Sequence, residues 1–451
     1  MRRMCFRVRW LKWIQWCIST VRLSILVNGE PFDFFGSSRG IRHGDPFSPY
    51  LFILVMEALS KLLDRACDIG IISGLETSPS TSSELRISHL LYADDTILFC
   101  GDNDEELRNL RCVLLCFEAV YGLKINMERS EIVLVRSNYA AALADILDCK
   151  IGSFPLNYLG LPVGAGARNK DVWNVIIDRM ERKLAGWKKM HLSKGARLTL
   201  IKASLSSLPT YFMSPFVIPK SVADRIEKIQ RDFLWDSGEN TCNFHLVKWS
   251  DVCQPLSSGG LGIRSLVNFS KALLWKWFWR FANERSALWR QVISSKFGAS
   301  KSDWHTKVPS FFSGVSLWKP MLKFSPIFEM QVKFNAGEGD GRKINFWNDC
   351  WCGDQSLRTE FPSLFQVSLN EEVKVGDLYC YSNGVWNLSF SRNFYGFELL
   401  HSVSSFFSKI YSDFKRVEGP DSMYWKLMKS GMLSIKSYYD SLVDTGNSSF
   451  P

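Results

Sequence analysis

The sequence lacks the features that would place the chain in a membrane, outside the cell or around a zinc ion. No apolar run approaches the roughly 18 residues that a membrane-spanning helix needs, and the longest, Leu51 to Leu59, contains Glu57. The 12 cysteines are scattered rather than arranged as a disulfide framework or a zinc motif, and the six histidines are isolated. The sequence therefore predicts an intracellular protein, nuclear or cytoplasmic, that is neither secreted nor membrane-bound.

The individual cysteines support this interpretation. Cys100, Cys112 and Cys116 stand among apolar residues and are expected to be free, buried thiols. Cys350 and Cys352 are two positions apart, too close for a usual zinc pair. We therefore predict no zinc site.

Acidic residues are absent from the first 29 residues, which carry six Arg or Lys. A mitochondrial presequence has this charge pattern, but three Trp in the same segment are unusual for one. The whole chain has a net charge of +10, and residues 179–202 hold eight Lys or Arg against one acid, Glu181. The charge favours a polyanionic partner, although a solvated basic surface would explain it as well.

Hydrophobic periodicity predicts a chain that changes character near residue 165. Before that point it predicts helices and strands in alternation: a helix over 6–19, a strand pair over 21–27 and from 31, a helix over 50–66, a strand pair over 88–100, a helix over 104–121 that ends at Gly122, and a strand over 131–135. After it, helices are predicted over 169–187, 193–207, 219–235 and 264–297. From about 300, aromatic residues are frequent and periodicity is weak.

Four tryptophans within the last predicted helix could stack on nucleic-acid bases. They are Trp275, Trp277, Trp279 and Trp289. Because the neighbouring Leu and Phe residues follow helical spacing, burial in a core is the favoured interpretation.

The strongest local signal for function is Tyr92-Ala93-Asp94-Asp95, which stands between two short apolar strands. Two adjacent carboxylates at a hairpin tip repel each other unless water or a cation lies beside them. Enzymes that transfer nucleotides use such carboxylates to hold two divalent ions. Alone, the four residues would more readily be an ordinary Asp-Asp turn.

A second signal lies about 50 residues upstream, in a loop rich in Gly and Pro that leads into a predicted helix. The loop reads RGIRHGDPFSPYLF from Arg39 to Phe52, and its Gly and Pro residues would fix a tight backbone next to a ligand. Ser48 is predicted to cap the helix. By itself, the loop is equally well explained as a helix cap.

In this order, the loop and the acidic turn resemble the second and third palm motifs of reverse transcriptases. Gly122 to Asn126, followed by Ser130-Glu131, resembles the fourth motif, and Tyr158 to Pro162 resembles the fifth, which lies near the primer end. The segments WIQWCISTVRLSILVNG, LSKGARLTLIKASLSSLPTYFMS and FWNDCWCGD resemble plant non-LTR (LINE-type) retrotransposon proteins. A weaker likeness around Ser434 to Tyr438 points to the start of a zinc-binding-like segment that follows such polymerases.

The resemblance implies a role for each matching residue. Asp94 and Asp95 would hold Mg²⁺, and Tyr92 would pack below them or touch the primer, although a Tyr in a strand is equally well explained as a core residue. The residues expected to position template and nucleotide are Arg39, Gly40, Gly44, Asp45, Pro46 and Ser48. Tyr158, Leu159 and Gly160 would grip the primer. Phosphate contacts are expected from Lys183, Lys188, Lys189, Lys194, Arg197 and Lys202.

Three departures from the family pattern bear on activity. Arg129 stands where a Lys commonly serves as general acid, and a guanidinium gives up a proton poorly. His43 replaces a usual Gln. The first palm motif, which supplies another metal-binding Asp before the first predicted helix, has no counterpart, since the first Asp of the chain is Asp33. We therefore expect a chain that begins downstream of this motif and of the fingers and does not polymerise DNA alone.

The predicted fold is α+β. It comprises an incomplete reverse-transcriptase palm over 1–165, an antiparallel sheet with packed helices; a mainly helical thumb or connection over 166–300; and an irregular C-terminal region over 301–451. The predicted function is RNA-directed DNA synthesis with Mg²⁺, an RNA template, a DNA primer and dNTPs. The alternatives are a non-catalytic nucleic-acid-binding remnant or a decayed fragment of a retroelement.

Overall fold

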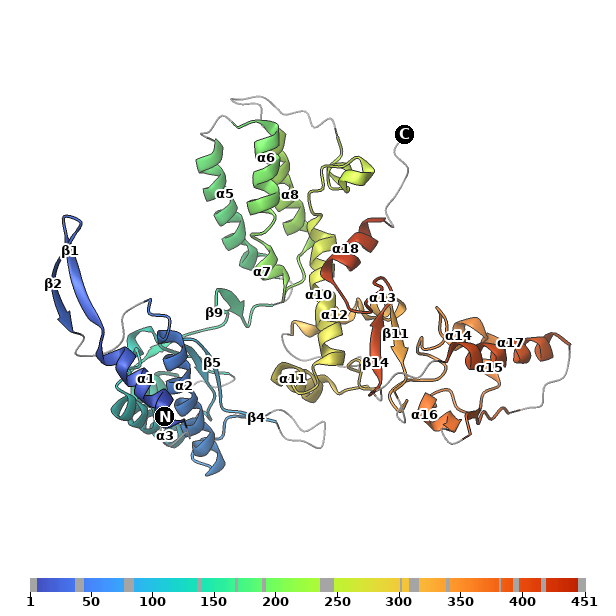
Figure 1. The fold of residues 1–451 in the computed structure, drawn as a ribbon, viewed down its shortest axis with the longest axis horizontal. Helices are drawn as coiled ribbons and strands as arrows, with labels where there is room; N and C mark the ends of the chain where they lie inside the picture. Colours follow the sequence, from blue (N-terminus) through green and yellow to red (C-terminus); the bar gives the residue numbers. More distant parts are fainter. Residues whose placement is uncertain are drawn as a thin grey trace. The chain divides into compact units, whose positions relative to one another are not determined.

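The computed structural model divides the chain into two compact units, of which each is described by itself (Figure 1). The first comprises Met1–Glu76 and Arg86–Ser153, and the second Thr77–Leu85 and Phe154–Pro451. The residues described are 6–36, 44–76, 85–135, 140–166, 169–188, 192–235, 247–300, 302–307, 316–337, 341–380, 383–391, 397–414 and 419–444. Helices and small sheets alternate in them, and each described sheet has two strands. None of the described helices is long and apolar enough to cross a membrane.

The first unit confirms the helices and strand pairs predicted from periodicity. Its elements in chain order are α1 (Val8–Ser19), β1 (Arg22–Val27), β2 (Glu30–Gly36), α2 (Ser48–Asp68), β3 (Leu75–Glu76), β4 (Arg86–Ile87), β5 (His89–Tyr92), β6 (Asp95–Leu98), α3 (Asp104–Tyr121), the 3-10 turn η2 (Met127–Arg129), β7 (Glu131–Ile132), α4 (Ala140–Leu147) and β8 (Lys150–Ile151). The strand predicted over 131–135 is shorter, and it pairs with β8 in parallel. The other pairs in this unit are antiparallel.

Helices α2 and α3 build the core of the first unit. Apolar residues at helical spacing face each other: Leu59, Leu63, Ala66, Cys67, Ile72, Leu110, Leu114 and Phe117 are buried together. The Asn103 side chain accepts a hydrogen bond from the Glu106 backbone N–H and so caps α3, and Gly122 ends it at φ 71° as predicted. Cys112 and Cys116 lie on the opposite face and are exposed, so their predicted burial is wrong.

The β1–β2 hairpin turns at Asn28-Gly29, where both residues have positive φ (53° and 88°), as the favoured two-residue turn requires. Figure 1 shows it extending away from α1 and α2. Its apolar side chains are exposed, among them Leu26 at 70% and Phe32 at 71%. Among the described residues of this unit, nothing buries this ribbon.

The second unit begins with a short hairpin and continues with helices. The first elements are β9 (Leu156–Tyr158), β10 (Leu161–Val163), the 3-10 turn η3 (Asp171–Trp173), α5 (Asn174–Lys188), α6 (Lys194–Leu200), the π-helical turn η4 (Ile201–Leu205), α7 (Thr210–Met213), α8 (Lys220–Trp235), α9 (Trp249–Val252) and η5 (Leu256–Ser258). These helices share a core that includes Trp173, Met180, Leu205, Met213 and Ile226. The helical character predicted for 169–235 is confirmed.

Helix α10 (Leu266–Asn283) joins this core to a second, aromatic one. Trp275 has no exposed surface and stacks on Tyr438, with ring centroids 3.4 Å apart. The core interpretation of the tryptophan cluster is therefore confirmed for Trp275 and Trp279, and Trp277 and Trp289 pack against the same core. The helix predicted over 264–297 is two helices, because α10 ends at Asn283 and α11 (Leu288–Phe297) begins five residues later.

The C-terminal part contains more regular structure than periodicity predicted. Its elements are α12 (Trp318–Leu322), α13 (Ser325–Met330), β11 (Val332–Asn335), α14 (Leu357–Glu360), α15 (Pro362–Gln366), α16 (Val375–Leu378), β12 (Tyr379–Cys380), β13 (Val385–Trp386), α17 (Phe397–Asp413), β14 (Ser422–Trp425) and α18 (Ile435–Asp444). The aromatic core runs from Ala272 to Tyr438 and so includes residues from both sides of position 300. The predicted palm, thumb and C-terminal boundaries stay predictions.

Candidate active site

The acidic turn lies where two strands of the first unit meet. Strands β5 and β6 are antiparallel, with His89 opposite Leu98 and Tyr92 opposite Asp95. Ala93 and Asp94 form the two-residue turn, and Ala93 adopts a positive φ of 50°. Asp94, Asp95 and Tyr92 are exposed, so Tyr92 is not a core residue. The predicted strand–turn–strand geometry is confirmed, and it presents both carboxylates to solvent.

His89 attaches this hairpin to helix α2. Its Nε2 lies 2.8 Å from the Ser60 hydroxyl of α2, and its Nδ1 lies 2.7 Å from the Ser88 hydroxyl. Burial lowers the pKa of His89 although Asp64 lies 3.9 Å away, so the neutral ring is favoured. A neutral ring bonds both hydroxyls, because one nitrogen donates and the other accepts. Nothing in the sequence around the acidic turn singles out this contact.

Glu106 ties together the two ends of the hairpin region. Its Oε2 accepts hydrogen bonds from the backbone N–H and the hydroxyl of Ser73, both at 2.9 Å, and from the Gly101 N–H at 2.8 Å. Burial raises the pKa of the Glu106 carboxyl, but these bonds and one from Asn103 outweigh it, and the net pKa is lowered. The carboxylate therefore holds the chain after β6 against the segment that follows α2.

The Gly/Pro loop is described only from Gly44 onward, so Arg39, Gly40 and His43 lie outside the described residues. Gly44 has a φ of 86°, which favours glycine. Ser48 is the first residue of α2 and the N-cap position is Phe47, whose side chain makes no capping bond, so the predicted cap at Ser48 is wrong. Asp45 takes that place instead: its side chain accepts from the Phe47 N–H at 2.8 Å and its carbonyl from the Ser48 N–H at 3.1 Å.

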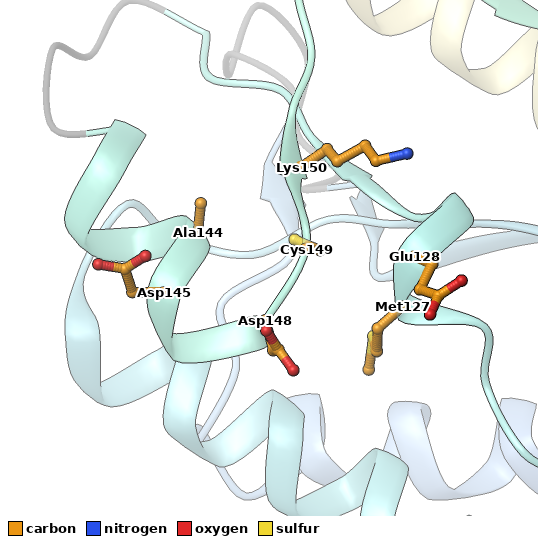
Figure 2. A pocket seen from close by; sticks show the side chains of 7 residues that line it. All are labelled: Met127, Glu128, Ala144, Asp145, Asp148, Cys149 and Lys150. Carbon is orange, nitrogen blue, oxygen red and sulfur yellow. The ribbon is translucent and has the colours of Figure 1, made fainter.

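Arg129 ends the η2 turn, where its backbone N–H donates to the Asn126 side chain at 3.1 Å. A hollow of about 500 Å³ lies beside this turn, between η2 on one side and α4 and β8 on the other (Figure 2). It is lined by Met127, Glu128, Ala144, Asp145, Asp148, Cys149 and Lys150. None of these residues was predicted as a site residue, and Arg129 itself is not among them.

The predicted primer-end residues form a second hairpin, which belongs to the second unit. Strands β9 and β10 pair with Tyr158 opposite Leu161, and the turn residues Leu159 and Gly160 both have positive φ (52° and 75°). Leu161 packs against the helical core. The Tyr211 hydroxyl of α7 donates to the Leu159 carbonyl oxygen at 2.8 Å. Sequence reasoning missed Tyr211, because the bond joins residues 52 positions apart.

Five of the six predicted phosphate-binding residues lie on α5, on α6 and in η4. Lys183, Lys194 and Lys202 are exposed. Lys183 Nζ donates to the Ser204 hydroxyl at 3.1 Å, and Lys194 Nζ lies 5.4 Å from the centre of the Trp235 ring. Arg197 donates to the Phe233 carbonyl oxygen, so it also serves the structure of α8. Lys188 ends α5, and Lys189 lies outside the described residues.

Metal binding by the described residues would depend on the hairpin pair. Across that part of the chain, no group of three or more His, Cys, Asp or Glu side chains is placed to hold a metal ion. Asp94 and Asp95 nevertheless suit Mg²⁺, which prefers oxygen ligands and commonly takes one or two protein carboxylates together with substrate phosphates.

Comparisons with known proteins find similarity to reverse transcriptases and to retroelement proteins. Residues 3–163 match the family described as "Reverse transcriptase (RNA-dependent DNA polymerase)". The chain is 31% identical over 289 residues to a putative ribonuclease H protein of Arabidopsis thaliana, an alignment that covers 62% of this chain and 44% of that relative. It is 49% identical over 74 residues to an uncharacterized mitochondrial protein of the same plant, covering 16% of this chain and 58% of that one.

A third relative is the retrovirus-related Pol polyprotein from the type-1 retrotransposable element R2 of Popillia japonica. It is 31% identical over 100 residues, which cover 22% of this chain and 13% of the polyprotein. The chain thus spans less than two thirds of the length of each of these relatives.

Proposed function

We propose that the chain takes part in RNA-directed DNA synthesis of a non-LTR retrotransposon, because residues 3–163 match the reverse transcriptase family and two of its relatives are named as retroelement or ribonuclease H proteins. Its partners in this proposal are an RNA template, a DNA primer and dNTPs. The observation that carries the proposal is the β5–β6 hairpin, which pairs Tyr92 with Asp95 and exposes Asp94 and Asp95 at its tip.

In this proposal, the two carboxylates of the hairpin would hold divalent ions. Bound divalent ions would neutralise charge on the attacking and leaving oxygens of nucleotide transfer. Asp94, at the turn, and Asp95, the first residue of β6, would orient those ions, and His89 and Glu106 would keep the hairpin in place. Tyr158 to Gly160, in the second unit, would hold the primer end.

The same residues set a limit on turnover. Asp94 and Asp95 would supply two ligands, and the described residues place no third carboxylate beside them. Losing a ligand that stabilises the transition state lowers the rate directly. Arg129 is also a poor proton donor for the leaving pyrophosphate. We therefore propose that these 451 residues bind nucleic acid but do not polymerise DNA on their own.

Primer extension tests this limit. The purified chain is incubated with a DNA-primed RNA template, dNTPs and Mg²⁺, beside the Asp94→Ala variant. The expected result is no extension by either protein. Extension by the unmodified chain that disappears in Asp94→Ala would show a complete active site and overturn the limit, while establishing the polymerase assignment outright.

Nucleic-acid binding tests the remaining part of the proposal. Affinity for a labelled RNA–DNA duplex should fall steeply with salt, because Lys and Arg release counterions from phosphates. Replacing Lys183, Lys194 and Lys202 by Gln should lower the slope of log affinity against log salt by about 3, about 1 for each phosphate contact.

A matched variant controls for net charge. Lys323, Lys429 and Lys436 are also exposed and lie in the C-terminal part, so replacing them by Gln removes the same charge elsewhere. This variant should bind like the unmodified chain. Equal slopes for the two triple variants would show that the basic helices are only a solvated surface.

A further inference from the structure

Tyr211 makes a bond that joins the helical core to the turn of the β9–β10 hairpin. It lies on α7, between Thr210 and the buried Phe212 and Met213, which are 2% and 0% exposed. These two buried neighbours fix the orientation of α7. Tyr211 itself is 52% exposed, and its hydroxyl donates to the Leu159 carbonyl oxygen at 2.8 Å.

The hairpin that receives this bond has little stability of its own. Each strand has three residues, and an isolated two-stranded hairpin is marginal in water. Leu159 adopts a left-handed φ of 52°, a conformation that a branched side chain rarely takes and that persists only where its surroundings impose it. The hydroxyl of Tyr211 bonds to the carbonyl of this same residue and is therefore placed to impose it.

Packing of the hairpin against the helical core is shown at Leu161, and the Tyr211 hydroxyl bonds to the turn itself. Leu161, the first residue of β10, packs against the helical core and holds the start of that strand. Leu159 and Gly160 lie beyond it, in the turn. Removing the hydroxyl would leave the strands paired but release the turn.

We propose that Tyr211 is a positioning residue that sets the hairpin turn Leu159-Gly160 for contact with the 3′ end of the primer. The inference rests on the proposed function for the primer contact, but not for the anchoring of the turn. Tyr211 acts through the hairpin and does not touch the reacting atoms.

The test compares two variants of the full chain that each lose one hydroxyl. Tyr211→Phe removes the bond to Leu159. Tyr424→Phe is the matched control, because the Tyr424 hydroxyl also donates to backbone carbonyls, of Met428 at 3.3 Å and Lys429 at 3.1 Å, far along the chain from the hairpin. Both variants keep the aromatic ring and should fold.

Hydrogen exchange measures the anchoring directly. In Tyr211→Phe, amides of residues 156–163 should exchange about 5-fold faster, as expected for the loss of one hydrogen bond. The same amides should be unchanged in Tyr424→Phe. Unchanged exchange in Tyr211→Phe would overturn the inference, whatever the protein does with nucleic acid.

A fluorescent base measures the contact with the primer. The RNA–DNA duplex carries 2-aminopurine either at the 3′ end of the primer or near its 5′ end. Tyr211→Phe should lose most of the fluorescence change at the 3′ end, while total affinity and the 5′ signal stay within about 2-fold of the unmodified chain; a role in general stability would not separate the two labels.

The other possible results separate the primer contact, the proposed function and the anchoring of the turn. Equal loss at both labels would show that Tyr211 does not act at the primer end. If the unmodified chain binds no duplex, the proposed function and the primer contact fail together. Faster exchange in Tyr211→Phe would then still show that Tyr211 fixes the turn.

Discussion

Helix α10 of the second unit and the β1–β2 hairpin of the first are both rich in aromatic residues, yet their surroundings are opposite. Trp275 in α10 has no exposed surface and meets Tyr438, Phe328 and Trp425. Phe32 in the hairpin is 71% exposed. Aromatic content therefore does not reveal which segment forms a core. Large exposed apolar patches are typical of surfaces that a further polypeptide covers.

The contrast also separates two kinds of stability. In the second unit, aromatic residues are buried by segments from distant parts of the chain, all of which belong to the described residues. In the first unit, the α2–α3 core supports the β5–β6 hairpin, while the β1–β2 ribbon adds nothing to that core. Substitutions in the two regions should differ accordingly.

The largest difference should come from tryptophan truncation. Trp275→Ala leaves a cavity in the aromatic core and should lower the free energy of unfolding by about 3–5 kcal/mol. Trp16→Ala, at a position 67% exposed on α1, should change it by less than about 0.5 kcal/mol. Urea unfolding of both variants measures the difference in free energy of unfolding. Equal losses would show that Trp16 on α1 is buried in the protein.

Glu106→Gln should have the next largest effect. It weakens the bonds to Ser73 and Gly101 and should cost about 1–3 kcal/mol, whereas the exposed neighbour Glu105→Gln should be neutral. Because the folded-state pKa of Glu106 is lowered, its contribution is fully present above the ordinary pKa of 4.5 and is lost as pH falls through the folded pKa. A pH series of urea midpoints should lose this dependence in Glu106→Gln but keep it in Glu105→Gln.

His89 should give a smaller effect in a different pH range. Its pKa is lowered by burial, so the unfolded chain binds more protons below the ordinary value of 6.5. The stabilisation is present above 6.5 and declines as pH falls through the folded pKa. His89→Gln should flatten the dependence of the first unit's stability on pH below 6.5. Hydrogen exchange of the β5 and β6 amides measures that stability. A slope that persists in this variant would assign the titration to another group.

The smallest effect is expected at the exposed ribbon. Phe32→Ser should change the free energy of unfolding by less than about 0.5 kcal/mol. It should also reduce aggregation, because it removes apolar surface from water. Light scattering at increasing protein concentration measures the second result. A destabilisation above about 1 kcal/mol would mean that the hairpin packs against the rest of the protein.

Local sequence patterns predicted those helices and turns whose formation depends on residues close together in the chain. The periodicity of Leu107, Leu110, Leu114 and Phe117 gave α3, and Asn28-Gly29 gave the β1–β2 turn. The acidic turn was found because its residues are contiguous. The same periodicity places Cys112 and Cys116 on the outer face of α3, so their exposure could have been predicted.

The supports of the candidate site could not be read in this way, because their partners are distant in sequence. The Glu106 carboxylate meets Ser73, His89 meets Ser60, and Tyr211 meets Leu159. The buried Asp421 likewise accepts bonds from the backbone N–H groups of Gly337 and Gly341. Sequence patterns indicate candidate site residues, but the residues that hold them in place emerge only from the tertiary fold.

Metal binding at the β5–β6 tip is the most direct test of the central claim. Mn²⁺ is added to the methyl-labelled chain, and broadening of the Thr96 and Ile97 methyl signals is followed with and without a primer–template duplex. We predict broadening that strengthens with the duplex, disappears in Asp94→Asn and persists in the control Asp102→Asn. Signals that Mn²⁺ leaves sharp, or broadens equally in Asp94→Asn, would contradict the assignment of this hairpin as a metal-binding site.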